Sequence, residues 1–393
     1  MRIAGIIAEY NPFHNGHAYH IRETRARAGA DLVVAAMDGH FTQRGDLAAL
    51  AKWTRVRMAL LGGVDAVFEL PTLYAVRPAE TFAAAGVAIL NGVGADVLSF
   101  GFDAELPGRE PLALVRALAG LRACEPAAFS AALRARLAEG MPHARAWGET
   151  AAEWLGLPVE PLRQPNAILA VEYARAVESQ GARLELCAVP RVGGYHDRAL
   201  GEYASASAIR AALAQGDARA AVAVPEALRP FLSEAAGSHG LDDVLLDRLR
   251  TAPEADLAAL ADASEGIERR LQRLAWTASD RAALLEALRC RRYTQARLSR
   301  LLAQALLGLT RGFAAAQPLP RYARLLGMRR EARPLIAELG RRASLPILSR
   351  PAELRGDPAF ELECRAADLW ALSRNAPEER RAGRECTEKF IVV

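Results

Sequence analysis

The chain contains 393 residues, of which 51% are hydrophobic, and its formal net charge is +4. This length and apolar content suffice for two or three domains with sizeable cores. No apolar run reaches the length of a membrane span, and the N-terminus has no charged leader followed by an apolar stretch and a cleavage site. These features exclude helical membrane proteins and secreted precursors, and they predict a soluble cytoplasmic protein without a membrane partner.

The first predicted element is a buried strand over residues 3–8, followed by a loop and a helix that begins near His17. Pro12 ends the strand, and Gly16 allows the backbone to pass close to a ligand. The helix would direct its free N–H groups at an anion, and His14 and His17 can both reach one phosphate. Each imidazole can donate a hydrogen bond to it, neutral or protonated. The alternative is that both histidines are ordinary polar surface residues.

Further strands are predicted over residues 32–37, 66–70 and 97–100, with helices over residues 17–29 and 54–61 between them. This alternation indicates right-handed crossovers and a parallel sheet that helices cover on both faces. Ligands of such sheets bind beyond the carboxyl ends of the strands, so we expect the loops there to converge. The residues at these ends are His14, Gly39, Pro71 and Gly101.

A helical insertion and a second phosphate-binding element are predicted next. Residues from about 106 to 157 are rich in alanine, leucine and arginine with helical spacing. The sheet resumes over residues 183–189. Ser205 or Ser207 then caps a helix whose N–H groups, together with Arg210, can bind phosphate oxygens. Simple helix capping is the alternative, but the N-terminal histidines favour phosphate binding.

From about Gln215 onward, the sequence predicts no further strand. Helical segments such as residues 282–289 and 294–309 are separated by glycine, proline and polar turns. We therefore expect a sheet domain over residues 1–214 and an α-helical domain over residues 215–393.

Positive charge is concentrated in the second half of the chain. The two lysines are Lys52 and Lys389, and residues 281–350 contain 15 arginines and 3 glutamates, a local charge of +12 that leaves −8 for the rest of the chain. Such a region suits a polyanion, and Tyr293 and Tyr322 could stack on the unpaired bases of an RNA loop. A solvated helical face is the alternative.

Five cysteines are scattered along the sequence without the close pairs of a zinc site. We expect reduced structural thiols and no metal site. The cysteines are Cys124, Cys187, Cys290, Cys364 and Cys386.

The chain also carries an ordered set of motifs that spans nearly its whole length. They are Glu9–His17, Phe41–Asp46, Lys52–Arg55, Glu69–Pro71, Pro165–Tyr173, Ser205–Arg210, Glu265–Glu268 and Arg292–Arg297. Together they resemble the bacterial tRNA(Met) cytidine acetate ligases, a family of the nucleotidyltransferase superfamily. A lone His-x-Gly-His signature would indicate only the superfamily, whereas the ordered set indicates this family.

The resemblance implies an α/β fold, in which a Rossmann-like parallel-sheet nucleotidyltransferase domain with a helical insertion precedes an α-helical, basic, tRNA-binding domain. It also implies an ATP-dependent ligase that requires no covalent protein nucleophile. Acetate would attack the α-phosphate of ATP, bound as its Mg²⁺ complex, to give acetyl-adenylate and pyrophosphate. The exocyclic amine of the wobble cytidine of elongator tRNA(Met) would then take the acetyl group; DNA is not an expected partner.

The same resemblance implies roles for individual residues. His14 and His17 would stabilise charge on the α-phosphate, while Ser207 and Arg210 would hold the outgoing pyrophosphate. The implied ATP-binding residues are Ile7, Ala8, Glu9, Tyr10, Asn11, Pro12, Phe13, His14, Asn15, Gly16, His17, Ala18, Tyr19, His20, Gly101, Asn166, Arg191, Ser207 and Arg210. Within the basic region, the expected tRNA contacts are Arg291, Arg292 and Arg297.

The sequence departs from the family pattern at two places. Asp38 stands where a small serine is usual, which leaves the shape of the pocket open, and Phe102-Asp103 follows Gly101 where Ser-Glu is common.

Two alternative functions remain. One is an enzyme that adenylates a phosphorylated cofactor precursor, which would not need a large basic domain. The other is a non-catalytic, ATP-responsive RNA-binding protein, which would not need the histidine pair.

Overall fold

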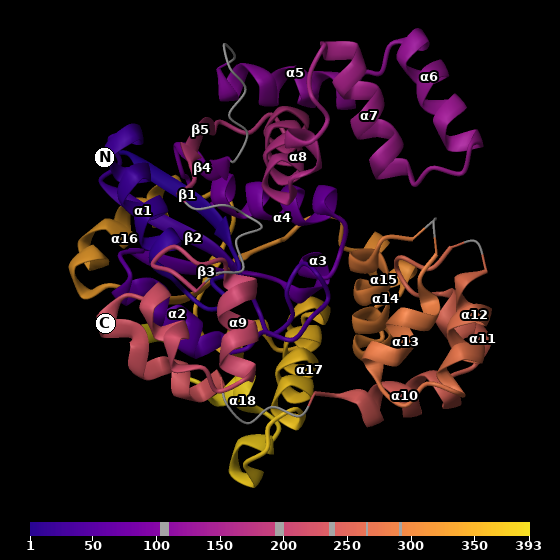
Figure 1. Ribbon diagram of the computed structural model, residues 1–393. Coiled ribbons are helices and arrows are strands. Elements are labelled where there is room, and N and C mark those ends of the chain that lie inside the picture. Colours follow the sequence, from indigo (N-terminus) through magenta and orange to yellow (C-terminus); the bar gives the residue numbers. More distant parts are fainter. Residues whose placement is uncertain (103–109, 193–199, 236–239, 265, 291–292) are drawn as a thin grey trace.

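The computed structural model describes residues 1–102, 110–192, 200–235, 240–264, 266–290 and 293–393. In these residues, eight strands form one sheet (Figure 1). Five strands are parallel neighbours in the order β5-β4-β1-β2-β3. Their bounds are β1 Ile3–Ala8, β2 Leu32–Asp38, β3 Ala66–Leu70, β4 Val97–Phe102 and β5 Glu185–Pro190. The predicted parallel sheet of a Rossmann-like fold is therefore confirmed.

Both faces of the sheet are covered, as the continuous apolar strands predict. Every residue of β2 is buried. Its successive side chains enter different cores, because Val34 packs with helix α4 (Ala79–Gly92) and Val33 packs with helix α2 (Lys52–Leu61) on the opposite face. Other helices of this part are α1 Asn15–Ala28, α3 Thr72–Ala75, α8 Pro165–Ser179, α9 Ala206–Ala214 and α16 Arg333–Arg342.

Three helices form the predicted insertion between β4 and α8. They are α5 Pro111–Ala123, α6 Ala127–Ala138 and α7 His143–Leu155. Helix α5 packs along α8, so the insertion extends from one side of the sheet (Figure 1). Its apolar residues continue the core of that face.

The expectation that no strand follows Gln215 is wrong. Strand β6 (Ala323–Met328) pairs antiparallel with β3, and the two-residue strands β7 (Ile347–Leu348) and β8 (Ile391–Val392) pair with β6. All six residues of β6 are buried, including Arg324. The arginine interrupts the apolar run that would have revealed the strand, and buried glutamates from distant segments compensate its charge.

Six α-helices of the second half gather into a lobe, described over residues 242–264, 266–290 and 293–315, which we call the helical lobe (Figure 1). Its hydrophobic core is distinct from the cores on the two faces of the sheet and also includes residues of α3 and of the segment 358–372. Its helices are α10 Asp242–Thr251, α11 Glu254–Ala258, α12 Ile267–Ala275, α13 Arg281–Leu288, α14 Gln295–Leu307 and α15 Arg311–Ala315. Helix α17 (Pro358–Leu372) contacts both α14 and α3, and the short helix α18 (Arg384–Thr387) packs on α17. None of the described helices is long and apolar enough to cross a membrane.

Candidate active site

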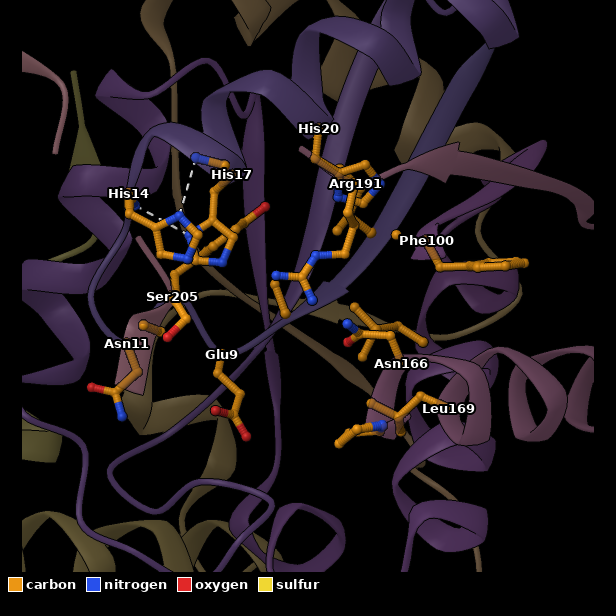
Figure 2. Close-up of a pocket in the computed structure, with 18 of the residues that line it drawn as sticks. Glu9, Asn11, His14, His17, His20, Phe100, Asn166, Leu169, Arg191 and Ser205 are labelled. Atoms are coloured by element: carbon orange, nitrogen blue, oxygen red, sulfur yellow. Dashed lines mark hydrogen bonds between the residues drawn. The ribbon is translucent and has the colours of Figure 1, made fainter. Parts of the chain in front are cut away.

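A cavity lies beyond the carboxyl ends of β1, β4 and β5, where the topology predicts a ligand (Figure 2). Its walls are the loop after β1 with the first turns of α1, the first turns of α8, the residues after β5 and the first turn of α9. Segments far apart in the sequence therefore meet at one edge of the sheet.

His14 and His17 cap helix α1 reciprocally. The Nδ1 atom of His14 accepts a hydrogen bond from the backbone N–H of Gly16 at 3.1 Å, and Nδ1 of His17 accepts one from the N–H of His14 at 3.2 Å. A neutral imidazole has one N–H, so both rings carry their proton on Nε2. Both histidines line the cavity, and each keeps one N–H donor for a ligand.

The packing around this pair fixes its geometry. The two imidazoles stack with ring centroids 3.7 Å apart, and the Tyr10 ring lies edge-on to His17 at 4.9 Å. Tyr10 has a φ of 46°, a left-handed conformation that costs a non-glycine residue about 1 kcal/mol and turns the chain toward α1. A Cβ atom on Gly16 would lie 2.9 Å from Cε1 of His14, so any larger residue at this position would displace the imidazole.

Burial and neighbouring cations keep the cavity histidines neutral. Burial, followed by the charges of Arg191 and Arg210, lowers the pKa of His14 to about 3. Burial also lowers the pKa of His17 well below its ordinary value, and it lowers the pKa of His20 to about 4, with a further contribution from Arg191. The cavity is thus electropositive through its arginines, while the imidazoles serve as uncharged hydrogen-bond donors. An anion is the ligand that such a site favours.

The second element predicted to bind phosphate lines the same cavity as the first. Ser205 is the N-cap of α9, and its side chain accepts a hydrogen bond from the N–H of Ala208. Arg210 donates to the carbonyl oxygen of Asn11 at 2.7 Å and to Oγ of Ser207 at 3.2 Å. This guanidinium therefore ties α9 to the loop after β1, which holds the beginnings of α1 and α9 on the same cavity.

The opposite wall carries Arg191 and Asn166. Figure 2 shows the Arg191 side chain reaching into the cavity between the histidines and Asn166. A Cβ atom on Gly101 would lie 3.1 Å from Cγ and Cδ of Arg191, so the glycine leaves room for the arginine to cross the end of β4. His20 contacts the same strand, because its Nε2 lies 3.0 Å from Oγ of Ser99.

Most residues predicted to bind ATP line this one cavity. They are Ile7, Ala8, Glu9, Tyr10, Asn11, His14, Gly16, His17, Tyr19, His20, Gly101, Asn166, Arg191, Ser207 and Arg210. Pro12, Phe13, Asn15 and Ala18, all within described segments, do not line it. Phe13 is fully buried in the core, and the Asn15 amide donates to the carbonyl oxygens of Glu202 and Val222.

Sequence reasoning missed other lining residues. Gln43 and Arg44 follow β2, while Phe82 and Tyr173 come from α4 and α8. The backbone N–H of Gln43 donates to Oε1 of Glu9 at 3.1 Å, which connects the loop after β2 to the loop after β1. Gln43 and Arg44 belong to the motif Phe41–Asp46, but only the fold shows that this motif reaches the cavity.

Asp38 does not line the cavity, which answers the question raised by the missing serine. It is fully buried, and its Oδ1 accepts a hydrogen bond from Nη1 of Arg55 at 2.8 Å. The same guanidinium donates to the carbonyl oxygens of Glu9, Asp38 and Gly39. Arg55 thus joins the carboxyl ends of β1 and β2, and Asp38 neutralises it from outside the pocket.

Of the three arginines expected to contact tRNA, the structure describes Arg297. Arg291 and Arg292 lie outside the described residues. Arg297 is half-buried, donates to Oγ of Ser264 at 2.6 Å, and has its guanidinium 4.5 Å from the centroid of the Tyr293 ring. Moreover, residues 281–315 belong to the helical lobe, whereas 321–350 include β6 and α16 of the sheet part. A basic stretch of sequence is therefore divided between two places in the fold.

Lys52 does not reach the cavity either. It is fully buried, and its ammonium lies 2.5 Å from carboxylate oxygens of Glu69 and Glu385, which Arg324 also contacts. We call these four residues the buried ion cluster. Among the described residues, no group of three or more His, Cys, Asp or Glu side chains could hold a metal ion.

Comparison with known proteins agrees with this geometry. The sequence matches the HIGH Nucleotidyl Transferase family over residues 1–385. It is 39% identical over 368 residues to the tRNA(Met) cytidine acetate ligase of Syntrophotalea carbinolica, covering 89% of this chain and 85% of that protein. It is 32% identical to the corresponding Lysinibacillus sphaericus protein, with 95% of each chain covered.

Solved structures show the same fold over the full length. The Thermotoga maritima TmcAL crystal structure bound with alpha-thio ATP has a TM-score of 0.90 at 25% identity, with 100% of both chains covered. The apo form of that protein gives a TM-score of 0.91 at 26% identity, again with 100% coverage of both chains. On sequence, fold and cavity together, the chain belongs to the tRNA(Met) cytidine acetate ligase family of nucleotidyl transferases.

Proposed function

We propose that the cavity binds ATP and acetate and joins them as acetyl-adenylate, and that the acetyl group then passes to the wobble cytidine of elongator tRNA(Met). The observation that carries this proposal is the reciprocal cap of α1. It presents the Nε2–H donors of His14 and His17 beside Arg210 and the N-terminus of α9. This arrangement suits a triphosphate whose α-phosphate gains charge during attack.

The first half-reaction follows from that placement. An acetate oxygen forms a bond to the α-phosphorus of ATP, and the bond from that phosphorus to the bridging oxygen of pyrophosphate breaks. His14 and His17 donate hydrogen bonds to the α-phosphate oxygens, where negative charge accumulates. Arg210 and the N–H groups of α9 hold the pyrophosphate as it leaves. Because the histidines are neutral, they stabilise this charge without first having to lose or gain a proton.

The second half-reaction requires RNA at the same cavity. The exocyclic amine of cytidine attacks the acetyl carbonyl carbon, AMP departs with the oxygen that joined it to the acetyl group, and the amine loses a proton. ATP would enter as its Mg²⁺ complex, with the ion held by the phosphates. The names of the related ligases support this acceptor. We further propose that exposed arginines of the helical lobe contribute RNA phosphate contacts.

Acetate-dependent exchange of labelled pyrophosphate into ATP tests the first step, and transfer of labelled acetate to tRNA(Met) tests the second. We expect pyrophosphate exchange when acetate is present without tRNA, and we expect transfer of the labelled acetyl group only when tRNA is added. Exchange that requires phosphopantetheine or nicotinamide mononucleotide would instead indicate a cofactor adenylyltransferase. ATP binding without exchange under any of these conditions would indicate a non-catalytic RNA-binding protein.

A further inference from the structure

Two cysteines far from the cavity lie next to each other in space. The Sγ atoms of Cys364, on α17, and Cys386, on α18, are 3.7 Å apart. All five cysteines belong to described segments, and these two form the thiol pair that is within contact distance. We infer that Cys364 and Cys386 are an oxidative modification site, which a peroxide or a disulfide oxidant converts into an intramolecular disulfide.

The surrounding structure keeps the two thiols together. Each cysteine directly follows a buried glutamate, so each is fixed by its neighbour. Glu363 accepts hydrogen bonds from the backbone N–H and the hydroxyl of Thr72, and Glu385 belongs to the buried ion cluster. In addition, the N–H of Gly383 donates to Oδ1 of Asp368 at 2.7 Å, which joins the start of α18 to α17.

These anchors lie within four residues of each thiol on both helices. The sulfur–sulfur gap of 3.7 Å therefore belongs to a held geometry. A bonded pair is separated by about 2.05 Å. Rotation of the exposed Cys386 side chain can bring the two sulfur atoms closer.

The two thiols have different exposure, which sets the order of the chemistry. Cys386 is exposed, whereas Cys364 is half-buried, and burial together with the neighbouring Cys386 raises the pKa of Cys364 to about 12. Cys386 therefore reacts first: its thiolate attacks hydrogen peroxide, the O–O bond breaks, and a sulfenic acid forms. The Cys364 sulfur then attacks that of Cys386, and its proton leaves with hydroxide as water. Overall, two thiols and one peroxide give one disulfide and two waters.

The bond would tie the C-terminal segment to α17 across a separation of 22 residues. A constraint of this size raises the thermal midpoint by about 5 °C in the oxidised protein. Neither cysteine lines the cavity, so the activity of the folded enzyme should be the same in both redox states. This inference does not depend on the proposed function.

The test is peptide mapping of the full chain after treatment with hydrogen peroxide and alkylation of the remaining thiols. We expect a Cys364–Cys386 linked peptide in most molecules and no linked peptide that contains the exposed Cys124. The oxidised protein should melt about 5 °C above the same sample reduced with dithiothreitol. Cys386→Ser, at an exposed position, should abolish the linked peptide and the shift, whereas Cys124→Ser should retain both.

A second variant checks the order of the steps. In Cys364→Ser, oxidation should stop at the sulfenic acid of Cys386, which dimedone traps. Recovery of Cys364 and Cys386 as alkylated thiols after peroxide would overturn the inference. So would a disulfide that joins either of them to Cys124, Cys187 or Cys290.

Discussion

The carboxyl edge of the sheet is used in two different ways. At the ends of β1, β4 and β5 it is open, and the described residues lining the cavity include a single carboxylate, that of Glu9. Against it stand three arginines and three histidines: Arg44, Arg191, Arg210, His14, His17 and His20. At the ends of β2 and β3, by contrast, α17 and α18 close the edge, and the buried ion cluster places Lys52 and Arg324 against two glutamates.

This difference separates binding from structure. A cation matched by a buried carboxylate has its charge compensated within the protein and holds segments together. The cavity wall has more cations than carboxylates, together with neutral hydrogen-bond donors. Its positive potential therefore extends into the cavity, where it attracts an anionic ligand. Substitutions in the two places should therefore change different quantities.

The largest effect should come from opening the buried ion cluster. Lys52→Met leaves Glu69 and Glu385 with Arg324 as their shared partner, and loss of one member of a buried pair costs about 3–5 kcal/mol of unfolding free energy. Urea denaturation measures this loss, and exchange activity per folded molecule should stay near normal. The matched control is Lys389→Met, because the second lysine of the chain is exposed. Equal stability of the two variants would contradict the structural role of the cluster.

Removing a histidine of the α1 cap should affect catalysis instead. His14→Ala or His17→Ala removes one oriented donor, a loss of about 3 kcal/mol of transition-state stabilisation, or roughly 100-fold to 1,000-fold in rate. Acetate-dependent pyrophosphate exchange measures it, with the thermal midpoint as the check on folding. His143→Ala, at an exposed position in α7, provides the control and should exchange normally. Near-normal exchange in a folded His14→Ala/His17→Ala protein would rule out this assignment.

Substitutions in the cavity wall that carries Arg191 and Asn166 should have a smaller effect. Arg191→Ala and Asn166→Ala should each weaken ATP binding by about 10-fold, since charge-assisted or amide hydrogen bonds to the nucleotide are lost. Isothermal titration with ATP measures the change. Arg183→Ala, exposed before the amino end of β5, removes the same charge away from the cavity and should leave the affinity unchanged. Unaltered affinity in both wall variants would show that this side of the cavity does not hold ATP.

Acid should destabilise the cavity through its histidines. The pKa of His14 is about 3 in the folded protein and about 6.5 when unfolded, so between these values the unfolded chain binds the extra proton. Stability therefore falls as the pH drops from 6.5 toward 3. Urea midpoints measured between pH 7 and pH 5 should decline less steeply in His14→Gln than in the wild type. Parallel pH profiles would mean that His14 is not held neutral.

The sequence revealed local features well and distant pairings poorly. The strands β1 to β5 and the His14–His17 loop were predictable because a few neighbouring residues determine strand burial, turns and helix starts. β6 was not, because Arg324 in it is acceptable only beside Glu69 and Glu385, which lie 255 and 61 residues away. Asp38 was open to misreading for the same reason, since its partner Arg55 lies on the next helix.

The basic region shows most clearly what charge in a sequence cannot predict. A charge of +12 over residues 281–350 indicates a polyanion site only if the arginines share a surface. In the fold, Arg281 pairs with Asp46, Arg342 pairs with Asp96, and Arg297 bonds within the helical lobe. Net charge in sequence cannot distinguish an arginine that faces solvent from one that holds two segments together.

The smallest effect is expected from substituting an exposed arginine of the helical lobe, which can be compared with a half-buried arginine of the same lobe. Arg289 is exposed at the C-terminal end of α13 and, among the described residues, pairs with Glu286, a type of surface ion pair that contributes little to stability. If RNA contacts this lobe, Arg289→Gln should weaken tRNA binding about 2-fold to 5-fold and reduce the slope of log affinity against log salt by about 1. Exchange activity and thermal midpoint should not change.

Arg297→Gln should show the opposite pattern, because its guanidinium bonds to Ser264 and stacks on Tyr293. We expect a lower thermal midpoint with no change in the salt slope. Filter binding of tRNA at several salt concentrations, together with melting curves, decides between the outcomes. An unchanged salt slope in Arg289→Gln would exclude this face of the lobe from the tRNA surface. A reduced slope in Arg297→Gln at full stability would support the tRNA contact that the sequence predicts for Arg297.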